Sequence, residues 1–421
     1  MKSLVTFLIS WCARRRLKRF KGSVIAVAGS AGKTSTIRAV TTLLATNKRV
    51  LSTRQNFNTE IGLSLVVLEL ELPDNTTNPL PWMRLTFRAF MRALRTLPYE
   101  VIVLELGVDK PGDMSKLIAI VKPYITVLTS LDGEHLEFFK SVEAAQAEEL
   151  VLTGSSQITI FDTQSISPSL QEKITSPKRV PVGPKTRYQL QVQSHALASG
   201  YTLKIIANDD ALSASCNLLG VHSLRAVLLA IAVAGELGLS AKQIVAGVEA
   251  IQPVSGRMRL FEGVEDDTWV IDDTYNAVGV EPVTAALDTL YSIKSPQRIA
   301  ILGSMNELGS FSKQAHETVG SYCDPLALDF VVTVGKDAAN YLAPAAKAKG
   351  CRVFVKNTPV EAGEFVLSRL QPKGVVLVKG SQNGVFLEEA VKLLLRNSDD
   401  EDFLVRQSDT WMAKKRAQGL L

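Results

Sequence analysis

The sequence predicts an α/β protein built on two doubly wound, mostly parallel sheets. From residue 23 to about 252, short apolar strand patterns alternate with helical patterns, and a second alternating block begins at residue 253. The chain has 421 residues, of which 46% are hydrophobic and 21% charged, as is typical of a globular protein with a sizeable core. We therefore predict a basic amphipathic N-terminal segment (1–22), a central domain (23–252) and a smaller Rossmann-like α/β domain (253–421).

Local patterns place the individual elements. In the central domain they predict strands at Val24–Ala28, Val101–Leu106 and Ile125–Leu128 and helices at Thr34–Ala45 and Leu224–Leu237, with a β-rich, irregular excursion over 157–215. In the smaller domain they predict strands at Trp269–Ile271, Arg298–Leu302, Phe330–Val334, Arg352–Val355 and Val375–Val378. The charged tail after Asn397 is predicted to be helical around Trp411.

The first predicted strand runs into a glycine loop and then a helix. This phosphate loop consists of Gly29, Ser30, Ala31, Gly32, Lys33 and Thr34 and is followed by Ser35. Its glycines allow backbone N–H groups to face a phosphate, Lys33 adds a positive charge, and the Thr34 hydroxyl can ligate Mg²⁺. The full P-loop pattern would place glycine at position 27, where this chain has Val27, so the loop is a shortened variant. We predict that these residues, Ser35 included, bind a nucleotide; an ordinary Gly/Ala turn is the alternative.

Two further polar residues follow strand patterns. Glu105 and His135 both come after apolar runs, at the carboxyl ends of strands, where α/β folds place ligands. The Glu105 carboxylate is a hard oxygen donor for a Mg²⁺ on Thr34, and His135 could ligate a second divalent ion. The alternatives are an ion-pair role for Glu105 and a purely structural role for His135.

Several motifs stand in a fixed order along the chain: Gly29–Thr34, Glu105, His135-Leu136-Glu137, Gly220-Val221-His222 and Gly256-Arg257-Met258. Four more stretches are Asn56–Gly62, Ile271–Ala277, Leu302–Gly309 and Lys379-Gly380-Ser381. With these motifs, residues 23–412 resemble the Mur ligase family, the ATP-dependent amide ligases of peptidoglycan synthesis. Folylpolyglutamate-type and cyanophycin-type ligases share the loop but lack the N-x-N-T-E and L-G-x-M-x-E-L-G signatures present here.

The resemblance implies a reaction. The γ-phosphate of ATP would pass to a substrate carboxylate, and an amine would then attack the acyl phosphate. The implied substrates are a muramoyl-peptide-like carboxylate and D-Ala-D-Ala or another amine, which implies a cytoplasmic role in cell wall biogenesis and cell shape. The resemblance implies a catalytic role for Lys33, Glu105, His135 and Lys379, with Lys379 and Ser381 at the acyl phosphate or the amine.

The resemblance also implies how the nucleotide and metal are held. Thr34 and Glu105 would hold the first Mg²⁺, and His135 would help to hold the second. The nucleotide would contact four residues outside the loop: His222, Arg257, Asp273 and Asn276. Because these binding residues are divided between two domains, closure around ATP before the reaction is expected.

The chain departs from the family pattern at several positions. The family carries a carbamylated lysine about fourteen residues after the histidine, whereas residues 143–149 contain no lysine and Glu149, or Glu148, takes that place. A carboxylate could replace the carbamate as a metal ligand, or the change could mark lost activity. Further departures are Ser223, Ala226, Val278-Gly279, Ser304 and Gln382. They leave a second function class open, a catalytically weakened ATP-binding partner or scaffold of a cell-wall synthesis complex.

Positive charge is concentrated near the N terminus. Residues 1–100 contain 16 Lys/Arg and 5 Asp/Glu, a net charge of +11, while the remainder carries −6. No aromatic-rich basic motif accompanies this charge, so we predict no nucleic-acid partner. Leu4–Lys21 and Trp82–Arg95 combine apolar and basic residues at helical spacing, which predicts peripheral association with an anionic membrane surface. For the first segment, a short helix packed on the protein is the alternative, and for the second, a solvated arginine face on a packed helix.

Two remaining features concern location and domain content. Four cysteines (Cys12, Cys216, Cys323 and Cys351) are scattered without a C-x-x-C pair, which favours a reducing cytoplasm. Membrane association predicted from the two basic segments would then be at the inner face of the membrane. Only 22 residues precede the first core strand, too few to fold a domain. We therefore expect the chain to lack the N-terminal UDP-sugar-binding domain that the family usually carries.

Overall fold

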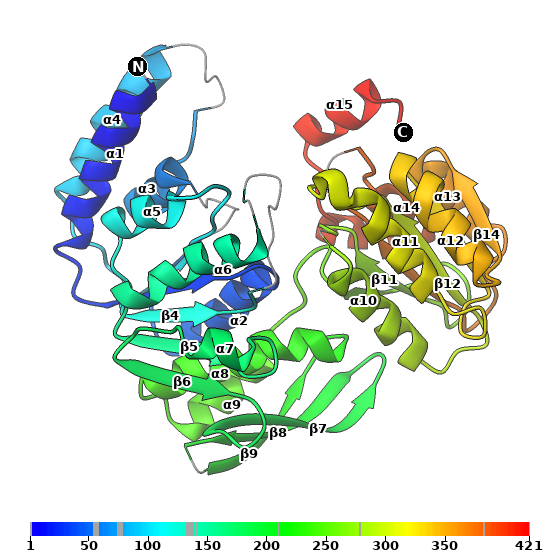
Figure 1. Cartoon of the computed structure of the whole chain (residues 1–421), viewed down its shortest axis with the longest axis horizontal. Coiled ribbons are helices and arrows are strands. Elements are labelled where there is room, and N and C mark those ends of the chain that lie inside the picture. Colours follow the sequence, from blue (N-terminus) through cyan, green and yellow to red (C-terminus); the bar gives the residue numbers. More distant parts are fainter. Residues whose placement is uncertain are drawn as a thin grey trace. The chain divides into compact units, whose positions relative to one another are not determined.

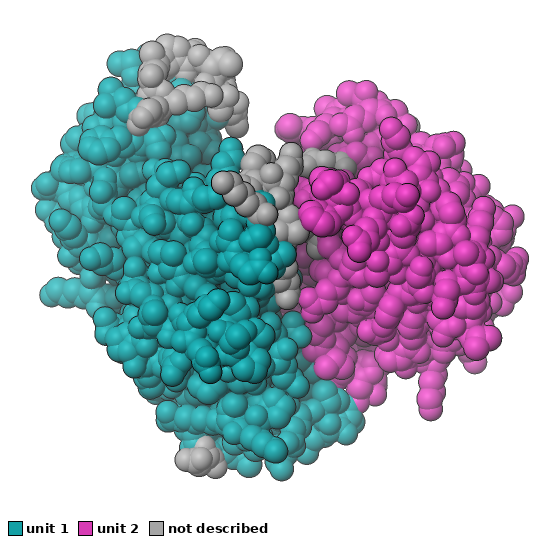
Figure 2. All heavy atoms as spheres, in the orientation of Figure 1, with its two compact units in different colours: residues 1–194, 202–216, 224–251 teal, residues 195–201, 217–223, 252–421 magenta. Residues whose placement is uncertain are grey.

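The structure, a computed structural model, describes residues 2–53, 59–73, 79–131, 139, 141–208, 210–277, 279–381 and 384–420. The chain forms two compact units (Figure 2). Unit 1 comprises residues 1–194, 202–216 and 224–251, and unit 2 comprises residues 195–201, 217–223 and 252–421.

Unit 1 is built on a twisted sheet in the order β2-β3-β1-β4-β5-β6-β7-β8-β9. Its strands in the described residues are β1 (Ser23–Ala28), β2 (Val50–Ser52), β3 (Val101–Glu105), β4 (Ile125–Leu128), β5 (Ile158–Asp162), β6 (Lys178–Val182), β7 (Tyr188–Ala196), β8 (Gly200–Ala207) and β9 (Asp210–Cys216). All pairings from β2 to β7 are parallel. The central strands β1, β3 and β4 are almost entirely buried, which explains their unbroken apolar sequences.

Helices cover both faces of this sheet (Figure 1). They are α1 (Lys2–Leu17), α2 (Lys33–Ala45), α3 (Glu60–Leu68), α4 (Pro79–Ala93), α5 (Asp113–Ile120), α6 (Val142–Leu150), α7 (Pro168–Gln171), α8 (Leu224–Glu236) and α9 (Ala241–Glu249). On one side, α1 and α3–α7 share a hydrophobic core with β1, β3 and β5. On the other side, α2, α8 and α9 pack against one another and against strands of the sheet.

Unit 2 has a second sheet in the order β10-β11-β15-β12-β13-β14. The strands are β10 (Arg259–Glu262), β11 (Trp269–Asp273), β12 (Arg298–Gly303), β13 (Phe330–Val334), β14 (Val353–Lys356) and β15 (Val375–Lys379). Only the β10–β11 pairing is antiparallel among those described. The helices are α10 (Glu281–Ser292), α11 (Ser312–Tyr322), α12 (Ala343–Ala348), α13 (Pro359–Leu367), α14 (Glu388–Leu394) and α15 (Asp409–Ala417).

Alternate residues of the unit 2 strands supply two separate cores. Ile271, Ala300 and Leu377 face α10 and α11, whereas their neighbours Val270 and Val376 face α13 and α14. This two-sided burial requires apolar residues at every position of the central strands. The predicted α/β fold is confirmed, and both sheets are mostly parallel with helices on both faces.

The N-terminal helix α1 packs against α3 and α4. Ile9, Cys12 and Ala13 are buried on its inner side. Arg16 belongs to the basic run of this segment, yet it is 1% exposed and forms an ion pair of 2.7 Å with Glu69. It also donates to the Val67 carbonyl at 2.9 Å, so this arginine anchors α1 and adds nothing to the basic surface.

In the part of the chain that the structure describes, no helix has both the length and the apolar character needed to cross a membrane. All four cysteines are buried and free.

Candidate active site

The phosphate loop has a backbone that requires glycine at two positions. Gly29 has a φ of +120° and Gly32 a φ of +85°, values that residues with a side chain rarely adopt. A Cβ atom on Gly29 would lie 2.5 Å from the Ser130 carbonyl oxygen. Gly32 is the N-cap of α2 and has no side chain to cap it. The first turn of α2 therefore opens directly from the loop, and a helix N terminus of this kind favours an anion.

Hydrogen bonds hold the loop against the chain that follows β4. The Ser30 N–H donates to the Ser130 carbonyl at 2.9 Å, and the Ala31 N–H donates to the Ser130 hydroxyl at 3.0 Å. The Thr129 N–H in turn donates to the Ala28 carbonyl at 3.0 Å. The first half of the loop is thus held by the residues that follow a neighbouring strand, which makes it a preorganised turn.

Lys33, the first residue of α2, turns its side chain back over the loop. Its ammonium group donates to the carbonyls of Gly29 at 2.6 Å and Ser30 at 2.8 Å. A positive charge is therefore held at the N terminus of α2, where the helix dipole also attracts negative charge.

Glu105 lies at the same edge of the sheet as the loop. It is the last residue of β3 and pairs in register with Val27 of β1, two residues before Gly29. Glu105 is 5% exposed, and its backbone N–H donates to the Thr53 hydroxyl at 3.2 Å. A carboxylate therefore stands beside the loop on the adjacent strand.

The structure distinguishes the two glutamates that could replace the missing lysine. Glu148 accepts a hydrogen bond of 2.9 Å from the Met114 N–H at the start of α5. Glu149 shares the buried face of α6 with Ala145 and is 7% exposed. Glu149 is therefore the better candidate for a metal ligand. The other predicted ligand, His135, lies outside the described residues, which end at Leu131 and resume at Phe139.

In unit 2, Asp273 and Lys379 stand side by side at the carboxyl ends of β11 and β15. They form an ion pair of 2.7 Å, and both side chains are buried. The Lys379 ammonium also donates to the Asn276 carbonyl at 3.3 Å. The sequence predicts that Lys379 contacts substrate; here Asp273 and Asn276 hold it.

Two buried polar atoms nearby have no hydrogen-bond partner among the described residues. They are Oδ1 of Asn276 and Nε of Arg257. The Arg257 guanidinium lies 4.5 Å from the centre of the Tyr275 ring, which fixes its direction. Buried polar atoms are usually satisfied, so this pair indicates a place where a polar ligand would bond.

The remaining predicted residue, His222, lies in the short 3-10 helix Val221–Ser223. Two departures from the family pattern have structural roles. The Ser223 hydroxyl donates to the Leu219 carbonyl at 2.8 Å, and the Ser304 hydroxyl accepts from the Ala338 N–H at 3.1 Å. Val278 and Gln382 lie outside the described residues.

A buried histidine shapes the loop after β12. His316 is 0% exposed; its Nε2 accepts from the Met305 N–H at 2.9 Å, and its Nδ1 lies 2.7 Å from the Ser312 carbonyl. This pairing needs a neutral ring with the proton on Nδ1. The Ser381 hydroxyl bonds the next residue, accepting from the Asn306 N–H at 3.1 Å.

Acid is expected to destabilise unit 2 through His316. Burial lowers the pKa of His316 from 6.5, although Asp337 acts in the opposite direction. A lowered folded-state pKa gives stability that is present above pH 6.5 and lost as the pH falls through the folded-state value. Between pH 6.5 and the lowered folded-state pKa, the free energy of unfolding should fall by up to about 1.4 kcal/mol per pH unit. In denaturant titrations, His316→Gln should show less of this loss than the wild type, and parallel curves would contradict the assignment.

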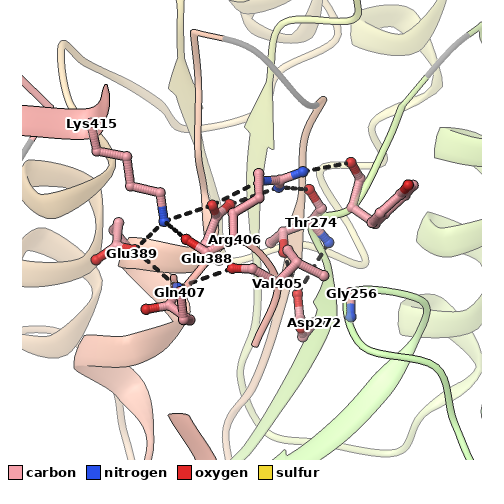
Figure 3. A network of polar contacts seen from close by, with 10 residues as sticks. Gly256, Asp272, Thr274, Glu388, Glu389, Val405, Arg406, Gln407 and Lys415 are labelled. Carbon is pink, nitrogen blue, oxygen red and sulfur yellow. Dashed lines mark hydrogen bonds and ion pairs between the residues drawn. The ribbon is translucent and has the colours of Figure 1, made fainter. Parts of the chain in front are cut away.

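A buried charge network, which the sequence patterns did not indicate, contacts the residues that precede Asn276 in unit 2 (Figure 3). Lys415 of α15 is 0% exposed and contacts Glu388 at 2.9 Å and Glu389 at 2.6 Å. Arg406 pairs with Glu388 at 2.8 Å and donates to the Thr274 carbonyl at 2.7 Å. It also donates to the carbonyl of Tyr275 at 3.0 Å. The network thus ties α14 and α15 to the turn that precedes Asn276.

Comparisons with known proteins agree with this architecture. The Mur ligase middle domain family matches residues 27–234, and the family described as Mur ligase, glutamate ligase domain, matches residues 256–382. The UDP-N-acetylmuramoyl-tripeptide--D-alanyl-D-alanine ligase of Synechocystis sp. is 29% identical over 90% of this chain and 76% of its own length. The Bacillus subtilis protein of the same name is 27% identical over 91% and 78%.

A solved structure shows the same fold. The MurF ligase from Thermotoga maritima, in complex with ADP, superposes with a TM-score of 0.75 at 23% identity. The superposition covers 94% of this chain and 84% of that one. Together the two domain matches span most of the sequence, in the order in which the structure presents them as units. The chain therefore belongs to the Mur ligase family.

Proposed function

We propose that this protein is an ATP-dependent ligase of peptidoglycan precursor synthesis that forms an amide bond. Its substrates would be a muramoyl-peptide-like carboxylate and D-Ala-D-Ala or another amine, as the names of its relatives suggest. The observation that carries the proposal is the preorganised phosphate loop with Lys33 over it and Glu105 on the adjacent strand.

In the proposed reaction, the γ-phosphoryl group of ATP moves to an oxygen of the substrate carboxylate, and ADP leaves. The amine nitrogen then attacks the acyl carbon, phosphate departs, and the nitrogen loses a proton. Such transfers depend on positioning and on neutralisation of charge. The loop amides and Lys33 would supply both, with the ammonium exchanging the carbonyls of Gly29 and Ser30 for phosphate oxygens.

Three oxygen-bearing residues of unit 1 are candidates for holding a magnesium ion: one in the loop, one on the adjacent strand and one on α6. Thr34, Glu105 and Glu149 offer a hydroxyl and two carboxylates, the oxygen ligands that Mg²⁺ prefers, and we propose that they hold it. Mg²⁺ bound there would neutralise phosphate charge. His135 stays a proposed ligand for a second ion.

In unit 2, we propose that Arg257, Asp273, Asn276 and His222 contact the nucleotide. Oδ1 of Asn276 and Nε of Arg257, which have no hydrogen-bond partner among the described residues, support this assignment. Lys379 is proposed to contact the acyl phosphate or the amine, and its pairing with Asp273 would orient the ammonium group until substrate binds.

A second function remains open because residues 143–149 contain no lysine. If Glu149 does not replace the carbamate, the chain would bind ATP without efficient turnover and serve as a scaffold in a cell-wall synthesis complex. The phosphate loop alone suits both functions.

A substrate screen separates the two. UDP-muramoyl peptides would be supplied with Mg²⁺-ATP and either D-Ala-D-Ala or single amino acids, and ADP and ligated product would be measured by mass spectrometry. The ligase predicts ADP release that requires the carboxylate substrate, and a hydroxamate when hydroxylamine replaces the amine. ATP binding with no substrate-stimulated ADP release would favour the scaffold.

We further propose a cytoplasmic location with peripheral association at the inner face of the membrane. The net charge of +11 in residues 1–100 supports an anionic partner for this part of the chain. The four free cysteines suit a reducing compartment.

A further inference from the structure

Helices α1 and α4 lie side by side at one end of unit 1 (Figure 1) and expose an unusual number of large apolar side chains. Among the described residues, twenty large hydrophobic side chains are exposed, and nine of them belong to these helices or to the residue directly after α4. They are Leu4, Phe7, Trp11, Leu80, Met83, Phe87, Phe90, Met91 and Leu94, with exposures from 38% to 68%. Clusters of this kind commonly mark a surface that binds a partner or a membrane.

The side chains of α4 fall into three stripes when they are placed at about 100° per residue. The first stripe packs on the core and includes Leu85, Ala89 and Ala93, all buried. The second is apolar and exposed, and consists of Leu80, Met83, Phe87, Phe90, Met91 and Leu94. The third lies between these two and consists of Arg84, Arg88, Arg92 and Arg95. Core packing therefore accounts for only one of the two apolar stripes of this helix.

The outer side of α1 continues the apolar stripe. Leu4, Phe7 and Trp11 are spaced three and four residues apart and so lie on one face, opposite the buried Ile9 and Cys12. The Trp11 and Phe90 rings lie 5.6 Å apart, which joins the two stripes. We call the exposed apolar and basic residues of α1 and α4 the two-helix surface.

Basic residues border this surface without any acidic neighbour on either helix. Residues 1–22 and 79–95 contain no Asp or Glu. Arg15 lies 5.5 Å from the centre of the Trp11 ring, at the boundary between apolar and basic side chains. Arg16 and Arg92 are paired with Glu69. Arg84, Arg88 and Arg95 are exposed and border the apolar stripe of α4.

We propose that the two-helix surface is the membrane-binding surface of this protein, with both helices lying in the plane of an anionic bilayer. The apolar stripe would enter the boundary between headgroups and acyl chains, and the arginine stripe would contact lipid phosphates. This inference specifies the proposed peripheral association and rests on it; it is independent of the ligase chemistry.

The charge of the two-helix surface favours an anionic bilayer over a second copy of the chain as its partner. Two-fold self-association through the surface would bring the arginine stripe of one copy near that of the other, with no acidic residue on either helix to compensate. An anionic lipid surface supplies both the apolar layer and the negative charge. A protein partner with an acidic, apolar surface is the alternative outcome of the test.

The test uses flotation of the full chain with phosphatidylcholine vesicles, with and without phosphatidylglycerol. We expect flotation with the anionic vesicles only. Leu80→Ser with Phe87→Ser should abolish it, and Arg84→Gln with Arg88→Gln should weaken it roughly fivefold for each arginine removed. The matched control is Leu326→Ser with Val355→Ser, which removes two apolar side chains that are 95% and 44% exposed in unit 2 and should float as the wild type does.

ADP release without vesicles serves as the independent readout and should be equal in all these variants. Wild type that stays at the bottom of the gradient with anionic vesicles overturns the proposal and leaves a protein partner as the explanation. Equal flotation of the Leu80/Phe87 variant and the control would also overturn it. If the wild type released no ADP, that result would instead count against the ligase function.

Discussion

Lys33→Ala is expected to lower substrate-stimulated ADP release about 10²–10³-fold, the typical loss when one preorganised group that stabilises transition-state charge is removed. The ammonium is held over the phosphate loop by two carbonyls, so its loss removes a positive charge fixed at the N terminus of α2. The Gly29 and Gly32 backbone and the bonds to Ser130 do not involve this side chain. The fold should therefore persist.

Two variants make the Lys33 experiment specific. Arg38→Ala removes an exposed cation from the same helix and should leave the rate within about twofold, because surface charges away from a site contribute little. Thermal unfolding monitors the fold of each variant. If Lys33→Ala retained the wild-type rate, the loop would not be the phosphate site. If the wild type itself released no ADP with any substrate pair, the scaffold function would be favoured.

The fold was predictable because its central strands have strong local patterns. Phe330–Val334 was predicted with the bounds of β13, and Val24–Ala28 falls one residue short of β1. Strands buried on both faces must be apolar throughout, so their sequences identify them without knowledge of their neighbours. That the phosphate loop and Glu105 lie at the same edge of the sheet was also predictable, because the carboxyl ends of parallel strands meet at one edge.

Partners distant in sequence were not predictable. The choice between Glu148 and Glu149 depends on how α6 packs against α5, and the burial of Arg16 depends on Glu69, the residue that follows α3. Lys379 was predicted to contact substrate, and its pairing with Asp273 arises only when β11 and β15 become neighbours. A basic run gives no local sign of which member will be buried.

The largest expected effect on stability comes from Lys415→Met. The Lys415 ammonium is fully buried and contacts Glu388, Glu389 and the Arg406 carbonyl. Among the described residues, its removal leaves the buried Glu389 carboxylate with one hydrogen bond, from the Gln407 amide at 3.1 Å. Loss of one partner from a buried charge cluster costs about 3–5 kcal/mol. The free energy of unfolding of unit 2 should fall by that amount in denaturant titrations.

The exposed neighbour of Lys415 provides a matched control. Lys414→Met removes the same charge from the same helix and should cost less than about 1 kcal/mol, because an exposed cation beside an aromatic ring contributes little. Adding Glu389→Gln to Lys415→Met should restore part of the lost stability, since it removes the carboxylate left without its lysine. If Lys415→Met cost no more than Lys414→Met, the network would not hold α15 in place. Because Arg406 links the same carboxylates to the carbonyls of Thr274 and Tyr275, hydrogen exchange should increase in Lys415→Met both in α15 and at the turn before Asn276.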